Sequence, residues 1–326
     1  MINCTENITT QHRDFVNNNG LNLIYDGETK AITASGLTED AEIYVNAGTL
    51  FTDSGAKAEY FKPALRTSIT ETADGLVGTQ VADGETGGYC PHCNQQATWT
   101  AFAPESTLVA SGHYYLTEAK AVTSQLKIGS TTDGEIASVA DVVLDLSGYA
   151  ATATYRFAFV YSTSELTILD SVGGGSVSGK GTNSSSGGVI YCEKGTLNIY
   201  GGKYTYNTGK TVRSGGIVCT TGNVCINGGI FDATAYNNTG YNGGVLYQSS
   251  STKLDITAGY FMGGTAKYGG AVYIGAKTTT NITGGQFRGG TATNGGGIYA
   301  NDSATVTMTG GKVDGNTAAN NGGGIY

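Results

Sequence analysis

The phrase Gly243-Gly244-Val245-Leu246-Tyr247 decides the fold, because close copies of it return along the second half of the chain. The other copies lie at 187–191, 215–219, 269–273 and 295–299, and a last one ends the chain as Gly323-Gly324-Ile325-Tyr326. Successive copies are 26 to 28 residues apart. A fixed period of this size is typical of stacked structural repeats.

A second phrase runs in phase with the first and alternates apolar with polar residues. Its first copy reads Leu197-Asn198-Ile199-Tyr200-Gly201-Gly202, and the later copies begin at Val224, Leu254, Thr280 and Val306. Alternation with a period of two indicates a β-strand that is buried on one face. Two or three such strands in each repeat, with Gly-rich corners, predict an all-β fold, a right-handed parallel β-helix with rungs of about 26–28 residues.

The position three residues after the first Gly of each phrase is always aliphatic, as at Ile190, Leu246 and Ile298. We expect this side chain to point inward and to stack on its copy one rung away, at about 4.8 Å. Burying one Leu or Ile contributes about 1.5–3 kcal/mol, so several per rung stabilise the solenoid once neighbouring rungs cover them. The paired glycines permit corners with positive φ and close passage of the backbone.

Glycine and charge are unevenly distributed along the 326 residues. Of the 52 glycines, 38 lie in 173–326. Residues 1–172 carry a net charge of −13 and residues 173–326 a net charge of +5. This excess is too diffuse for the basic stripe of a nucleic-acid-binding protein, although it permits weak attraction to acidic glycans. The chain contains no apolar run long enough for a membrane span.

The sequence divides into three regions. Residues 1–85 contain short β-like runs between turn residues and predict a β-rich N-terminal region. Residues 86–120 form a Cys/His knuckle and the entry to the solenoid, and residues 114–326 form the parallel β-helix, with regular repeats from 187. The N-terminus lacks the basic and apolar regions of a signal peptide. Since Tyr326 ends in mid-rung without a polar cap, we expect the solenoid to be C-terminally incomplete.

The segment Gly87-Gly88-Tyr89-Cys90-Pro91-His92-Cys93 contains a Cys-x-x-Cys knuckle. Two thiolates at this spacing can bind one Zn²⁺ from a tight turn, and a structural zinc takes four N or S ligands. His113 is the natural third ligand and His92 a candidate fourth, so Cys90, Cys93, His113 and His92 are the predicted zinc site. Asp83, Glu85 and His12 are further candidates. A disulfide loop and an unmetallated turn are the alternatives, whereas a thioredoxin-like role would need a βαβ context.

Three phrases after this knuckle resemble known proteins. They read Tyr114-Tyr115-Leu116-Thr117, Leu144-Asp145-Leu146-Ser147-Gly148 and Leu166-Thr167-Ile168-Leu169-Asp170. A Cys/His segment with a Trp, here Trp99, that leads into such phrases resembles the opening rungs of right-handed parallel β-helix surface proteins of gut Firmicutes. The resemblance covers roughly 90–181 and implies an extracellular or cell-surface location.

The later repeats are similar to the Gly-Gly-Ala-Ile repeats of polymorphic outer-membrane adhesins, most closely at Gly269-Gly270-Ala271-Val272-Tyr273. That family pairs the glycine phrase with Phe-x-x-Asn. Here the corresponding positions read Phe287-Arg288-Gly289-Gly290 and Val313-Asp314-Gly315-Asn316, so each copy keeps only one end of the motif. The resemblance implies an adhesin-type β-helix and does not extend to that family's secretion route.

Two aromatic series repeat with the rungs. By alternation, Tyr191, Tyr247, Tyr273, Tyr299 and Tyr326 face outward. Tyr247, Tyr273 and Tyr299 are therefore the candidate ligand-binding residues, although stacking on each other is the structural alternative. The series from Tyr204 through Phe231, Phe261 and Phe287 to Val313 predicts a stack inside a corner. Cys192 and Cys219 lie about one rung apart, which leaves either a disulfide or two buried thiols open.

Catalysis is not expected within these residues. Glycoside hydrolysis needs two carboxylates about 5–10 Å apart. Residues 173–326 contain five acids at different phases of the repeat (Glu193, Asp232, Asp255, Asp302 and Asp314) and no His. The sequence therefore favours a non-enzymatic bacterial cell-surface protein, an adhesin or exposed stalk that binds glycans or surface proteins along a lateral face. A fragment of a carbohydrate-active β-helix enzyme and a segment of a phage fibre or tailspike are the alternatives.

Overall fold

The computed structural model describes residues 66–90, 92–93, 95–103, 107–181, 186–207 and 212–326, and the backbone of five strands before residue 66. It divides the chain into two compact units, Met1–Ala101 and Phe102–Tyr326. The boundary falls inside the predicted knuckle segment 86–120. Within the described ranges there is no helix, and therefore none that could cross a membrane.

The first unit is β-rich, as its turn-separated β-like runs predicted. One sheet has the strand order β1-β2-β4-β7-β6, while β3 pairs with β5 and β8 pairs with β9. Trp99, in β9, is fully buried. The strands are β1 (Asn22–Tyr25), β2 (Ala31–Ser35), β3 (Ile43–Val45), β4 (Leu50–Asp53), β5 (Phe61–Pro63), β6 (Thr67–Thr72), β7 (Gly75–Gln80), β8 (Thr86–Cys90) and β9 (Gln95–Ala101).

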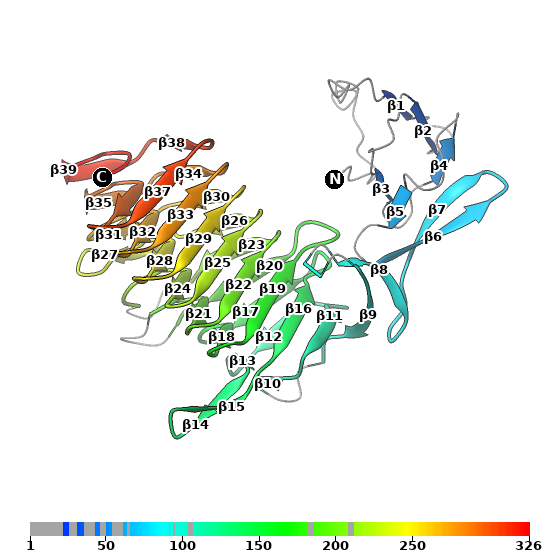
Figure 1. The fold of residues 1–326 in the computed structure, drawn as a ribbon, viewed down its shortest axis with the longest axis horizontal. Coiled ribbons are helices and arrows are strands. Elements are labelled where there is room, and N and C mark those ends of the chain that lie inside the picture. Colours follow the sequence, from blue (N-terminus) through cyan, green and yellow to red (C-terminus); the bar gives the residue numbers. More distant parts are fainter. Residues whose placement is uncertain are drawn as a thin grey trace. The chain divides into compact units, whose positions relative to one another are not determined.

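The second unit is a parallel β-solenoid, in which each turn adds one strand to each of three sheets (Figure 1). We number the sheets in the order in which the chain visits them. Sheet 1 consists of β10 (Leu108–Val109), β13 (Leu126–Ile128), β18 (Ala158–Val160), β21 (Ile190–Cys192), β24 (Val218–Thr220), β28 (Leu246–Gln248), β32 (Val272–Ile274) and β36 (Ile298–Ala300).

Sheets 2 and 3 follow in the same way. In this unit sheet 2 consists of β11 (Gly112–Tyr115), β16 (Asp141–Asp145), β19 (Glu165–Leu169), β22 (Thr196–Ile199), β25 (Asn223–Ile226), β29 (Lys253–Ile256), β33 (Thr279–Ile282) and β37 (Thr305–Met308). Sheet 3 consists of β12 (Lys120–Val122), β17 (Ala150–Ala153), β20 (Ser176–Gly179), β23 (Lys203–Tyr206), β26 (Ile230–Asp232), β30 (Tyr260–Met262), β34 (Gln286–Arg288) and β38 (Lys312–Asp314).

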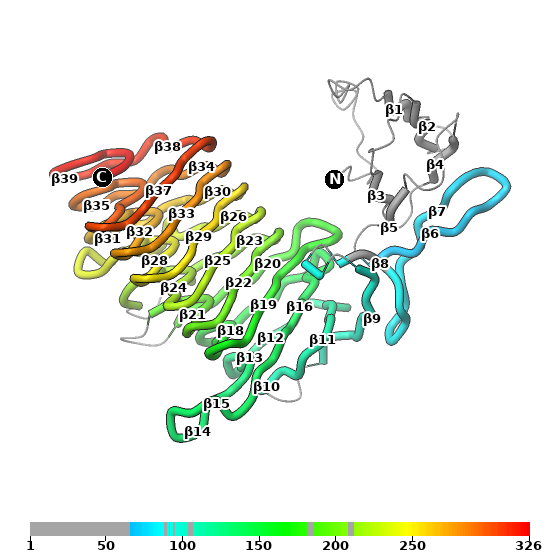
Figure 2. Tube along the Cα trace, viewed as in Figure 1, coloured from blue at the N-terminus to red at the C-terminus, as the bar shows by residue number. Residues whose placement is uncertain are grey.

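Two smaller elements complete the unit. The later turns add a fourth parallel sheet of β27 (Asn237–Asn238), β31 (Thr265–Ala266), β35 (Thr291–Asn294) and β39 (Thr317–Asn321). An antiparallel hairpin of β14 (Ser130–Thr132) and β15 (Glu135–Ser138) projects from the stack (Figure 2). Its turn residues Asp133 and Gly134 both have positive φ, which suits a tight hairpin turn.

The strand register confirms the predicted period. Ile190 pairs with Val218, Val218 with Leu246, and Leu246 with Val272, so equivalent places of the glycine phrase stack on consecutive turns. Each of these side chains is fully buried. On sheet 2 the alternating residues also face inward, and Leu197, Val224 and Leu254 are no more than 2 % exposed. The predicted parallel β-helix with its aliphatic core is therefore confirmed.

The two glycines of each phrase have different roles. Gly243 has φ of +70°, a left-handed conformation that costs other L-residues energy. At Gly244 the constraint is space, since an added Cβ would lie 2.0 Å from the carbonyl oxygen of Gly270 on the next turn. Only a residue without a side chain lets these two backbones pass so closely, which explains why the glycine is repeated.

Candidate functional site

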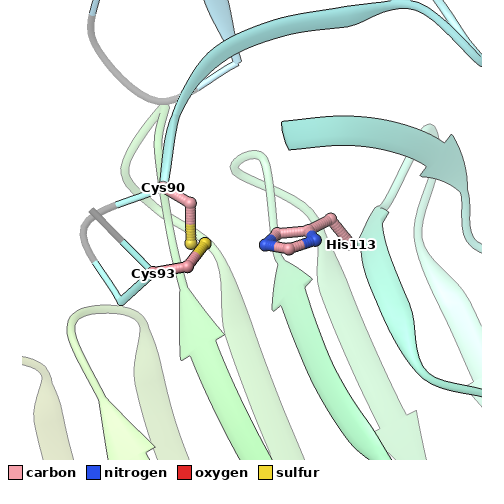
Figure 3. Close-up of side chains that lie close together, drawn as sticks. All are labelled: Cys90, Cys93 and His113. Atoms are coloured by element: carbon pink, nitrogen blue, oxygen red, sulfur yellow. The ribbon is translucent and has the colours of Figure 1, made fainter. Parts of the chain in front are cut away.

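The predicted metal ligands come from short β elements. Cys90 ends β8, Cys93 lies in the turn that leads to β9, and His113 is in β11. Figure 3 shows the side chains of these three residues, of which Cys90 and Cys93 belong to the first unit and His113 to the second. Cys90 is fully buried, while Cys93 and His113 are half-buried. Zinc binding by the four predicted ligands stays a prediction.

The buried Cys90 thiol differs from a reactive cysteine. Both are thiols in the structure, which differs from the alternative of a disulfide loop. Burial, followed by the hydrogen bond with Cys93, raises the pKa of the Cys90 thiol to about 12. Reactive cysteines instead have a lowered pKa and an electropositive, partly exposed setting.

The other predicted ligands lie elsewhere or have other partners. His92 is half-buried and lies in the turn between Cys90 and Cys93. The carboxylate of Asp83 accepts a hydrogen bond from the Ala101 backbone N–H at 2.5 Å. Glu85 accepts one from the backbone N–H of Ala82 at 3.4 Å. His12 lies outside the described residues.

The outward positions of sheet 1 form a column of aromatic rings. Ring centroids are 5.0 Å apart between Tyr247 and Tyr273 and 5.4 Å apart between Tyr273 and Tyr299, with interplanar angles of 3° and 4°. Tyr326 continues the stack 5.5 Å from Tyr299. Both faces of the Tyr273 ring are therefore covered, and a sugar ring cannot stack on it. Ligand binding by Tyr247, Tyr273 and Tyr299 stays a prediction, and it is restricted to ring edges and hydroxyl groups wherever the faces are stacked.

The inward aromatic series forms the predicted stack. Tyr204, Phe231, Phe261 and Phe287 are all fully buried. Their consecutive ring centroids lie 5.1, 4.8 and 4.6 Å apart, with interplanar angles of 15° or less. Val313 continues the column on the next turn. Parallel rings at these separations are favourable beyond their buried area, so this column is part of the core.

Cys219 interrupts the outward column between Tyr191 and Tyr247. Cys192 follows the outward Tyr191 in its strand and therefore faces inward, where it pairs with Thr220. Alternation places the two thiols on opposite faces of the sheet, and both are free. Of the two alternatives for these residues, the structure has buried thiols and not a disulfide, and burial raises the pKa of each to about 12.

Three of the five acids in 173–326 lie beside lysines. Asp255 is 2.7 Å from the Lys253 Nζ atom. Asp314 is 3.0 Å from the Nζ of Lys312, and Asp232 is 3.6 Å from that of Lys203. Asp232 is on sheet 3 and Asp255 on sheet 2, so they do not form a carboxylate pair on one face. The arrangement is that of ion pairs on the surface.

Two acids that the sequence did not single out close a corner of the solenoid. Asp145, fully buried at the end of β16, accepts hydrogen bonds from the backbone N–H and hydroxyl groups of Ser147 and Ser171. Asp170 accepts from the backbone N–H groups of Gly148 and Gly175, and burial raises its pKa. Both carboxylates satisfy backbone groups between turns, which is a structural role. Their signal in the sequence is an Asp at the end of an aliphatic run, with a Ser one or two residues later.

Sheet 3 presents an outward face of mixed chemistry, which we call the Arg288 face. Consecutive turns place its residues in two neighbouring columns, and the Lys203–Asp232 and Lys312–Asp314 pairs lie in it. Its members are Lys203, Ile230, Tyr260, Gln286 and Lys312 in one column and Asp232, Met262, Arg288 and Asp314 in the other. In the sequence, the residues of this face flank the inward aromatic residue of each repeat. Their chemistry differs from repeat to repeat, so the sequence pattern did not indicate them.

No protein-family model matches this chain, and neither does any curated protein or solved structure. The β-helix is therefore established by strand pairing alone. The resemblances to surface proteins of gut Firmicutes and to polymorphic outer-membrane adhesins stay predictions.

Proposed function

We propose that this chain is a non-enzymatic bacterial cell-surface protein, an adhesin or exposed stalk that binds glycans or surface proteins along a lateral face. The main support for the proposal is the difference between the inward and the outward positions of the solenoid. Inward side chains and corner glycines repeat from turn to turn, whereas the outward residues of sheet 3 vary while staying in register. A flat surface with variable side chains on a regular scaffold suits recognition.

The acids of the repeat region also support binding rather than hydrolysis. Asp232, Asp255 and Asp314 each lie beside a lysine, and the hydrogen bonds from Gln286 and Lys312 hold the pKa of Asp314 below its usual value. A general acid in a glycosidase needs the opposite, a raised pKa opposite a second carboxylate.

A binding array of glycans and bacterial or host surface proteins, probed with the whole chain, tests this function. We expect binding to at least one class and no change in the length of polysaccharides incubated with the protein. A blank array together with shortened polysaccharides would favour the carbohydrate-active enzyme. A blank array with a stable trimer in sedimentation would favour a phage fibre or tailspike.

We further propose that Cys90, Cys93 and His113 hold one structural Zn²⁺. Zinc binds thiolate sulfur at about 2.3 Å and imidazole nitrogen at about 2.0–2.1 Å, so ligand atoms around one ion lie within about 4 Å of each other. The Cys-x-x-Cys spacing places two thiols in one tight turn, which suits two of the four positions around a structural zinc. Zinc would stabilise the knuckle by cross-linking its ligands. His92, next to Cys93 in the chain, is the nearest candidate in sequence for the fourth position.

Metal analysis of the purified chain tests the zinc site. We expect one equivalent of zinc in the wild type and less than about a tenth of this in Cys90→Ser, because removing one thiolate of a three-ligand set weakens binding strongly. Cys225→Ser, which alters a half-buried thiol on sheet 2, is the matched control and should keep the full equivalent. Zinc retained by Cys90→Ser, or missing from the wild type, contradicts the site.

A further inference from the structure

Among the described residues, Arg288 is the one cation of the Arg288 face that forms no close ion pair, although the Asp314 carboxylate, its neighbour one turn later in the same column, attracts it. Lys203 and Lys312 lie 3.6 and 3.0 Å from Asp232 and Asp314. The Arg288 side chain is exposed, and its Nη1 atom donates a hydrogen bond to the Tyr260 hydroxyl at 3.2 Å. A guanidinium has five N–H donors, so most of them remain available to a ligand.

The surroundings of this guanidinium combine apolar and hydrogen-bonding surface. Tyr260 and Met262 are half-buried, and Ile230, one turn earlier in the Tyr260 column, is 43 % exposed. On the next turn Gln286 lies in the Tyr260 column and donates to the Asp314 carboxylate at 3.1 Å. A sugar ring has the same two properties, since it presents an apolar C–H face and a rim of hydroxyl groups.

We propose that the Arg288 face binds an acidic polysaccharide, with a uronate carboxylate on the Arg288 guanidinium and sugar rings over Ile230 and Tyr260. This deepens the proposed function and rests on it. Arginine matches a carboxylate by two parallel N–H···O bonds, which lysine cannot do. The hydrogen bond from Arg288 to the Tyr260 hydroxyl positions the guanidinium group before a ligand binds. The net charge of +5 over 173–326 adds a general attraction for a polyanion.

The spacing of the solenoid fits a chain ligand. Consecutive turns rise by about 4.8 Å, which is close to the length of one sugar ring in a polysaccharide. A strand of sugars lying along the axis would therefore meet a new pair of outward side chains with every residue. Ile230, Tyr260 and Gln286 lie in that order along one column.

Binding of the whole chain to polygalacturonate, measured by calorimetry, tests the proposal. The matched probe is the same polymer with its carboxylates converted to methyl esters. We expect Arg288→Gln to weaken binding to polygalacturonate about tenfold or more, and Tyr260→Phe to weaken it a few-fold by releasing the guanidinium. Lys253→Gln is the control, since it removes the same charge from an exposed residue of sheet 2. It should leave the affinity unchanged.

The methyl ester separates recognition of the carboxylate from recognition of the sugar. It should bind the wild type more weakly than polygalacturonate does, and Arg288→Gln should no longer distinguish the two polymers. Equal losses in Arg288→Gln and Lys253→Gln would show unspecific charge attraction and overturn the proposal. A wild type that binds other glycans or proteins but not polygalacturonate also overturns it, while the proposed function stands. A wild type that binds no glycan and no protein overturns both.

Discussion

Replacing Gly244 by alanine is expected to destabilise the solenoid by about 3 kcal/mol or more. The new Cβ would lie 2.0 Å from the Gly270 carbonyl oxygen and 2.8 Å from the Gly264 nitrogen. Both contacts are with backbone, which cannot move aside by changing a rotamer. The clash forces two turns apart and weakens the hydrogen bonds on both sides of them. Thermal unfolding followed by circular dichroism should show a melting temperature lower by about 6–12 °C.

Gly289→Ala is the matched control for this effect. Gly289 also belongs to the repeats and has φ of +71°, but a Cβ placed on it meets nothing within 4 Å. It should therefore cost only the backbone strain of a left-handed residue, about 1–2 kcal/mol. If both variants lose the same stability, close passage of the backbones is not the reason for the second glycine.

Replacing Phe261 by alanine is expected to cost about 3–5 kcal/mol, because it leaves a cavity in the middle of the inward aromatic stack. The ring is fully buried and lies 4.8 Å from that of Phe231 and 4.6 Å from that of Phe287. The cavity cannot close without moving the rings of both neighbouring turns. Denaturant unfolding at equilibrium measures the loss.

Tyr299→Ala is the corresponding change in the outward column. The Tyr299 ring also stacks on neighbours, but its edge is partly exposed, so we expect a loss of only about 1–2 kcal/mol. A loss as large as that of Phe261→Ala would mean that the outward column carries as much of the stability as the core. A loss below about 1 kcal/mol in Phe261→Ala would contradict the core role of the inward stack.

The repeating positions could be predicted from the sequence, because each occurs several times with the same chemistry. Ile190, Val218 and Leu246 occupy the same place in three consecutive repeats, and all three are aliphatic. Their burial and their strand register could therefore be predicted from the repeat spacing. The same holds for the stack of Phe231, Phe261 and Phe287. The Cys-x-x-Cys motif and His113 could be singled out because few residue types bind zinc, and their zinc binding stays a prediction.

The contacts of residues that occur only once could not be predicted from the repeat pattern. The partner of Arg288 is Tyr260, 28 residues earlier, and this pairing depends on register and on the neighbouring column together. The length of a turn changes from 28 to 26 residues along the chain, so sequence spacing alone does not show which outward side chains become diagonal neighbours. His92 was singled out by its place between the two cysteines, and its role as a fourth zinc ligand stays a prediction. Asp145 appeared as part of a strand phrase, although its carboxylate closes a corner.

The ladder hydrogen bonds between turns run along the axis of the solenoid, and this has a mechanical consequence. A force that pulls the two ends of the coil apart loads these bonds one turn at a time, as in a zipper, and not all together as in shear. Each turn that peels off releases about 27 residues, which extend to roughly 90 Å. A stalk built in this way would yield in steps and absorb a sudden pull before its attachment at either end fails.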